Sequence, residues 1–174
     1  MVEGLVQGVG FRPFIYRLAQ KHHLNGNVSN RTDGVVVNIS GSEKDIDFFK
    51  ADILKLAPPA ASIKKVDLIE IKDFISSEFT ILPSENIDHL VTEISPDIAV
   101  CEDCLEDLKT QEHRINYPFI NCTNCGPRFS IINKLPYDRI NTTMHEFQMC
   151  PECEKEYHSV LDRRFHAQPV ACNQ

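Results

Sequence analysis

The sequence predicts an α+β protein, in which a sandwich of sheet and helices is followed by small cysteine-rich modules. Three observations support this prediction. Apolar residues alternate between strand and helix periods in the first half, all seven cysteines lie in the second half, and six of them form C-x-x-C pairs. We therefore expect an α/β domain at 1–83, a linker at 84–98, a four-cysteine module at 99–149 and a second, truncated module at 150–174.

The first strand and the first helix are joined by a glycine-bearing turn. A short run of alternating apolar residues, Glu3–Gln7, predicts the strand, and Gly8-Val9-Gly10 follows it. Apolar residues then recur at the helical period over Phe11–His22. Pro13 suits the first turn of this helix, because a missing N–H costs nothing there.

A hairpin and a second helix come next. Asn27–Arg31 and Val35–Ile39 flank the pair Asp33-Gly34, which is typical of a tight hairpin turn. Ser42 is placed to cap a helix that ends at Pro58-Pro59. Two further strands are expected at Ile63–Ile71 and Glu78–Leu82.

The resulting order is strand, helix, strand, strand, helix, strand, with a short final strand. This order defines the split β-α-β arrangement of a ferredoxin-like α/β sandwich. In that fold both helices cover one face of an antiparallel sheet.

Composition and charge exclude several classes of protein. No apolar run approaches the roughly 20 residues that a membrane span needs, and the first residues lack the basic start of a secretory signal. The net charge of −7 lies wholly in residues 84–174, which argues against nucleic-acid binding. An odd number of cysteines fits a closed disulfide framework badly. We therefore expect a cytoplasmic chain with reduced thiols and no membrane partner.

The cysteine spacing predicts a metal site. Cys101-x2-Cys104 and Cys122-x2-Cys125 are separated by seventeen residues, the double-knuckle spacing of a tetrahedral zinc site with four thiolates. Because protein sulfur fills every position, the expected Zn²⁺ is structural, whereas a catalytic zinc keeps a position open for water.

A second metal site is predicted by an internal repeat of about 50 residues. When the two repeats are aligned, Arg114 corresponds to Arg163. The cysteines that correspond to ligands of the first site are Cys150, Cys153 and Cys172. It also predicts a fourth cysteine just past Gln174, so we interpret the chain as a fragment cut inside this module. Other possible fourth ligands are His158, His166 or a group from a neighbouring molecule. The spacing also leaves open an interleaved arrangement, in which the pair Cys101/Cys104 shares a metal with the pair Cys150/Cys153.

The loop before the first helix is a candidate anion site. A glycine-bearing turn that opens a helix can direct several backbone amides to one anion, and a guanidinium at the helix start adds positive charge. A plain tight turn without a ligand is an alternative interpretation. The G-x-G-x-x-G motif of dinucleotide-binding proteins is disfavoured, because Pro13 occupies the position of its third glycine. The candidate phosphate-binding residues are Gln7, Gly8, Val9, Gly10, Phe11 and Arg12.

Residues 3–83 resemble the acylphosphatase family. The resemblance rests on Gly-x-Val-Gln-Gly-Val-Gly-Phe-Arg at 4–12 and on Gly-Asn-Val-Ser-Asn-x-x-Asp-Gly at 26–34. It implies a ferredoxin-like fold and a catalytic pair in which Arg12 binds the phosphate and Asn30 orients the attacking water. One departure is that only three residues precede Gly4, which would shorten the first strand.

The whole chain resembles the N-terminal part of the HypF family of carbamoyltransferases, which are hydrogenase maturation factors. The motifs that carry the resemblance lie at 11–14, 117–129, 136–139 and 162–172. It implies a longer enzyme that uses carbamoyl phosphate, and ATP in later domains, to carbamoylate the C-terminal cysteine of HypE for the cyanide ligands of [NiFe] hydrogenase. The part present here is then expected to hydrolyse carbamoyl phosphate.

Two other classes remain as alternatives. One is a non-catalytic module in which the first domain binds an anion and the cysteine-rich half docks a partner. The other is a nucleic-acid binder of the zinc-ribbon type, against which the acidic second half argues.

Overall fold

The computed structural model describes residues 1–72, 74–84 and 95–174. Its contacts divide the chain into two compact units. The first comprises Met1–Gln7 and Phe11–Glu93, and the second comprises Gly8–Gly10 and Ile94–Gln174. Positions 85–94 of the predicted linker 84–98 lie outside the described residues. The exact domain limits given above therefore stay predictions.

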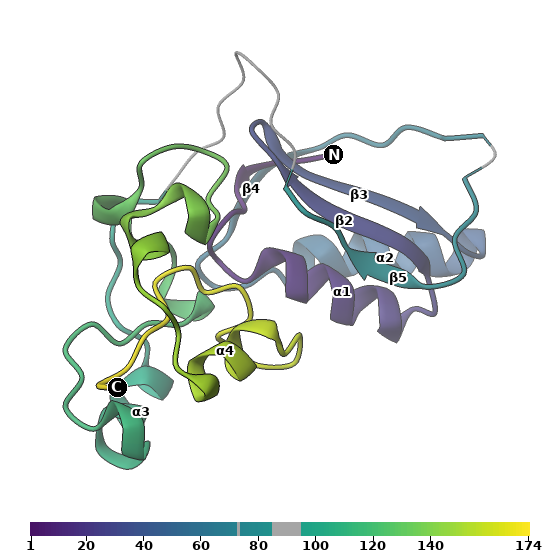
Figure 1. Cartoon of the computed structure of the whole chain (residues 1–174). Helices are drawn as coiled ribbons and strands as arrows, with labels where there is room; N and C mark the ends of the chain where they lie inside the picture. The colour runs from purple at the N-terminus through teal and green to yellow at the C-terminus, as the bar shows by residue number, and fades with distance from the viewer. Residues whose placement is uncertain (73, 85–94) are drawn as a thin grey trace. The chain divides into compact units, whose positions relative to one another are not determined.

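The first unit contains a five-stranded mixed sheet with the order β4-β1-β3-β2-β5 (Figure 1). The pairs β1–β4, β1–β3 and β2–β3 are antiparallel, which confirms the ferredoxin-like arrangement. The added edge strand β5 instead runs parallel to β2, so the sheet is not antiparallel throughout. The strands are β1 (Val2–Leu5), β2 (Asn25–Arg31), β3 (Gly34–Ser40), β4 (Ser62–Val66) and β5 (Phe79–Ile81).

Two helices, α1 (Phe11–Lys21) and α2 (Glu43–Lys55), lie on one face of this sheet, as Figure 1 shows. The predicted cap of α2 is present, because the Ser42 hydroxyl accepts a hydrogen bond of 3.2 Å from the Asp45 amide. Apolar side chains from helices and strands fill the space between the layers. Deeply buried examples are Val2, Phe11, Ile15, Leu18, Val28, Val35 and Phe49.

The predicted strand Ile63–Ile71 is wrong at its C-terminal end. β4 stops at Val66, and its pairing with β1 ends at two backbone hydrogen bonds of 2.9 Å that Met1 and Asp67 exchange. Ile69 and Ile71 lie beyond this pairing and are 81% and 55% exposed. An apolar alternation alone cannot show where the partner strand ends.

The second unit has little regular structure. Its helices are α3 (Glu102–Thr110) and α4 (Pro151–His158), and the rest of its described residues form short 3-10 helices, loops and one isolated β-bridge between Ile132 and Thr142. Its buried apolar side chains form two small groups, one around Cys104, Cys122 and Cys125 and the other around Cys153. Such small cores require additional crosslinks to be stable. Within the part of the chain that the structure describes, no helix is both long and apolar enough to cross a membrane.

Neighbouring phenylalanines on α2 test the core of the first unit. Phe49 is 1% exposed and Phe48 is 52% exposed. Phe49→Ala should destabilise this unit by about 3–5 kcal/mol, because it removes a buried ring and leaves a cavity. Phe48→Ala should cost less than about 1 kcal/mol. Hydrogen exchange at β2 and β3 measures both effects, and equal losses of protection would contradict the packing described here.

Candidate functional site

The loop between β1 and α1 has the backbone geometry expected of an anion nest. Gly8 and Gly10 have φ values of 71° and 73°, in the left-handed region that favours glycine. Within the described residues, no protein acceptor bonds to the backbone amides of Gly8, Val9, Gly10 and Phe11. Since unpaired amides require a partner, they are free to bind an anion or water.

Arg12 follows this loop at the start of α1, and its side chain is 7% exposed. Its Nη1 donates to the Ser84 hydroxyl at 3.4 Å, a contact that the sequence did not indicate because 72 residues separate the pair. The guanidinium is therefore buried beside Ser84, and it carries a permanent positive charge.

Asn30 lies near the end of β2 and is 1% exposed. Neither Nδ2 nor Oδ1 of this side chain has a hydrogen-bond partner within the described residues. A buried amide without partners is costly and rare in folded proteins. Asn30 thus has an NH2 group and a carbonyl oxygen available for a ligand or a water molecule.

The side chain of Gln7 holds the β2–β3 hairpin. Its Nε2 donates to the carbonyl oxygens of Arg31 and Gly34 at 2.6 and 3.1 Å. The hairpin turn itself is closed by Arg31, whose guanidinium binds both carboxylate oxygens of Asp33 at 3.0 and 2.7 Å. Gln7 therefore fixes the strand end that carries Asn30. Its predicted direct part in phosphate binding stays a prediction.

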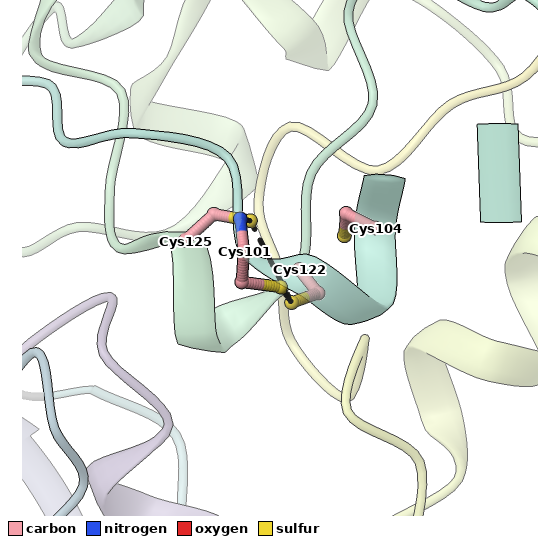
Figure 2. Close-up of side chains that lie close together, drawn as sticks. All are labelled: Cys101, Cys104, Cys122 and Cys125. Atoms are coloured by element: carbon pink, nitrogen blue, oxygen red, sulfur yellow. Dashed lines mark hydrogen bonds between the residues drawn. The ribbon is translucent and has the colours of Figure 1, made fainter. Parts of the chain in front are cut away.

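The first four predicted metal ligands converge. Figure 2 shows Cys101, Cys104, Cys122 and Cys125 facing one another, and their sulfur atoms all lie within 4.8 Å. The Sγ–Sγ distances are 3.5 Å for Cys101 and Cys122 and 3.8 Å for Cys122 and Cys125. A tetrahedral zinc with Zn–S bonds of about 2.3 Å separates its sulfurs by about 3.8 Å. The four thiolates therefore fit such an ion.

The second set brings together Cys150, Cys153 and Cys172, whose sulfur atoms also lie within 4.8 Å of one another. Since these three sulfurs lie apart from the first group, the two C-x-x-C pairs Cys101/Cys104 and Cys122/Cys125 form one site. The interleaved pairing, in which Cys101/Cys104 would join Cys150/Cys153, is wrong. Among the described residues, neither His158 nor His166 joins the three sulfurs. His166 instead stacks on Phe165 and Tyr157, with ring centroids 4.2 and 5.0 Å away.

Burial and mutual hydrogen bonding shift the titration of these thiols. Burial raises the pKa of Cys101 to about 11 and that of Cys153 to about 12. The hydrogen bond between Cys104 and Cys122 raises the pKa of Cys104 and lowers the pKa of Cys122. Each group of sulfurs therefore retains protons that a bound cation would displace.

Arginines surround both sets of sulfurs. Arg163 and Arg164 both pair with the carboxylate of Asp107. Direct guanidinium contacts to sulfur were not predicted. Arg163 Nη1 lies 2.9 Å from Cys104 Sγ, and Arg114 Nη2 lies 3.0 Å from Cys153 Sγ.

Family models match both halves of the chain. Residues 1–81 match the acylphosphatase model, and residues 100–132 and 149–174 match the HypF finger model. An acylphosphatase from Leuconostoc mesenteroides is 46% identical over 83 residues, which are 46% of this chain and 90% of that protein.

Longer relatives match nearly the whole chain. A carbamoyltransferase HypF from Rhodobacter capsulatus is 45% identical over 172 residues, 98% of this chain and 23% of the relative. A probable carbamoyltransferase HypF from Methanocaldococcus jannaschii is 49% identical over 143 residues, 80% of this chain and 19% of the relative. A crystal structure of full-length HypF in a phosphate- and nucleotide-bound form has a TM-score of 0.88 at 49% identity, covering 98% of this chain and 23% of that one.

The fold and the cysteine sets define an acylphosphatase domain joined to a cysteine-rich region of the zinc-finger type. The chain belongs to the HypF family, and it spans about a quarter or less of the length of these HypF relatives. Both resemblances drawn from the sequence are thereby confirmed.

Removing metal should affect the two units differently. Treating the purified chain with EDTA should abolish hydrogen-exchange protection in α3 and α4, because zinc binding supplies about 10 kcal/mol or more of folding free energy in small cysteine modules. Protection of β2 and β3 should not change, since the first unit has its own apolar core. Full protection of α3 after chelation would show that the cysteine sets are not held by metal.

Proposed function

We propose that the first unit hydrolyses carbamoyl phosphate to carbamate and inorganic phosphate. The observation that carries the proposal is the run of amides from Gly8 to Phe11 without protein acceptors. These donors suit the oxygens of a phosphoryl group, and Arg12 adds a planar charge able to contact two oxygens at once. The family membership supports an enzyme of the acylphosphatase class.

The proposed mechanism depends on charge stabilisation and on one positioned water. The loop amides and Arg12 would hold the phosphoryl oxygens and balance the charge that develops on them. Asn30 would orient a water molecule through its unpaired amide group. The water oxygen bonds to phosphorus as the bond from phosphorus to the carbamoyl oxygen breaks. The electron pair of the broken bond leaves with carbamate, and both water protons stay on the phosphate product as H2PO4⁻. Carbamate is a good leaving group, so no strong base is required.

We propose further that both cysteine sets hold Zn²⁺ in a structural role. The sulfur spacing of the first set supports this ion, and its four ligands leave no position for a reacting water. Cys150, Cys153 and Cys172 would supply three ligands to a second ion. Bound zinc supplies folding stability, because the buried apolar groups around the sulfurs are small.

In the whole enzyme we propose that this activity serves carbamoyl transfer to the C-terminal cysteine of HypE, with ATP used in domains beyond this span. The identities of 45% and 49% to HypF proteins support that assignment. A cytoplasmic location belongs to the same proposal, because seven unpaired thiols require a reducing compartment.

Phosphate release from carbamoyl phosphate tests the proposed hydrolysis. Arg12→Ala and Asn30→Asp should each lower kcat/KM by about 100-fold or more, because each removes a group that stabilises the transition state. Arg17→Ala is a matched control, since Arg17 is an exposed arginine on the same helix and should retain full activity.

Hydrogen exchange at β2 and β3 would confirm that the variants keep their fold. If the wild-type chain and all variants release phosphate only at the uncatalysed rate, the hydrolase proposal is wrong. The loop would then belong to the alternative class, a module that binds an anion and docks a partner without catalysis.

A further inference from the structure

The second unit contains corresponding residues separated by a constant interval. Cys101 and Cys104 correspond to Cys150 and Cys153, and the interval of 49 residues continues beyond the cysteines. The same interval relates two further pairs of residues, Asp107 with Glu156 and Arg114 with Arg163. Each half therefore contributes a C-x-x-C pair, a carboxylate and an arginine in the same order.

The first half of the second unit is here the repeat that contains Cys101 and Cys104, and the second half is the repeat that contains Cys150 and Cys153. Arg114, the arginine of the first half, binds the second half. Arg114 is 1% exposed, and its Nη2 donates to Cys153 Sγ at 3.0 Å and to Glu156 Oε2 at 2.6 Å. Its Nε donates to the carbonyl oxygen of Ala171 at 3.1 Å. Ala171 directly precedes Cys172, so one guanidinium contacts two of the segments that present sulfur.

The arginine of the second half makes the reciprocal contacts. Arg163 Nη1 donates to Cys104 Sγ at 2.9 Å, and its Nη2 donates to the carboxylate of Asp107. Its backbone carbonyl accepts from the amide of Thr123 at 2.9 Å, next to Cys122. Among the described residues, each arginine therefore binds the buried cysteine and the carboxylate of the opposite half, and not those of its own half.

We propose that Arg114 and Arg163 are positioning residues that couple the two metal sites, each supporting the thiolates of the opposite half. The inference rests on the proposed zinc binding by the cysteine sets. A four-thiolate zinc site carries a formal charge of −2, and a guanidinium bonded to its sulfur offsets part of that charge in a poorly solvated region. The same hydrogen bond fixes the direction of the sulfur. Zinc bound in one half therefore stabilises the chain segment that carries an arginine, and this arginine bonds to a sulfur of the other half.

The two sites then bind metal as one cooperative unit. Because each arginine belongs to the chain segment of its own half, loss of metal from one half loosens the segment that carries the arginine supporting the other, and the effect is reciprocal by linkage. Two independent fingers would behave differently, since removing an arginine from one half would leave the other half unchanged.

A chelator titration of the full chain loaded with zinc tests this coupling. After each chelator concentration, free thiols are alkylated and each cysteine peptide is quantified by mass spectrometry, so each site reports separately. Arg163→Met should lower the chelator concentration needed to strip Cys101, Cys104, Cys122 and Cys125 by about 10- to 100-fold. Arg114→Met should do the same to Cys150, Cys153 and Cys172.

Arg139→Met provides the matched control. Arg139 also lies in the first half and binds the second, but its partners are the carbonyl oxygens of Gln168 and Val170, together with that of Phe147. It touches no sulfur within the described residues, so its removal should leave the zinc retention of both sets close to that of the wild-type chain. Arg163→Lys, which keeps the charge and one donor, should recover part of the loss.

A spectroscopic readout separates support of the sulfur from general packing. In the chain loaded with ¹¹³Cd, Arg163→Met should shift the resonance of the site formed by the first four cysteines. Equal losses in Arg139→Met and Arg163→Met, or a loss confined to the half that carries the substitution, would overturn the coupling but not zinc binding. A wild-type chain that binds no zinc would overturn both. If only the four-cysteine set holds zinc in the wild-type chain, the coupling of two metal sites is overturned, and the Arg163 variants then test only whether Arg163 supports the sulfurs of that set.

Discussion

Four consecutive amides, from Gly8 to Phe11, have no acceptor within the described protein, and an anion is the partner that best fits them. Backbone donors are normally paired, so a run of open ones marks a place where a ligand completes the hydrogen bonding. The two left-handed glycines make the run possible, because other residues adopt that backbone conformation only with strain. In the proposed site, Arg12 and Asn30 add the charge and the polar group that chemistry at a phosphoryl group requires.

The second unit satisfies a different constraint. Its buried apolar groups are small, so sulfur clusters take the place of an extended core. The internal repeat places an arginine of each half against the buried cysteine of the other. Arg114 and Arg163 therefore link the halves through the same atoms that would bind metal. A repeat that looks like two separate fingers in the sequence is one connected network in the structure.

Local signals in the sequence predicted the fold well. The Asp33-Gly34 turn, the cap at Ser42 and the cysteine spacing all depend on residues close together in the chain, and the structure contains each of them. Features that depend on distant partners were missed. These include the early end of β4, the parallel pairing of β5, the contact of Arg12 with Ser84 and the arginine contacts to sulfur. Periodicity carries no information about which distant element a residue meets.

The central claim is that the amides of the loop and the guanidinium of Arg12 bind a phosphoryl dianion. The most direct test is to record amide chemical shifts of the full chain by NMR while inorganic phosphate is added. The resonances of Gly8, Val9, Gly10 and Phe11 should shift together in a saturable way, with the side-chain signal of Asn30 among the next most affected. Shifts distributed over surface lysines, or no saturable change in the loop, would contradict the claim.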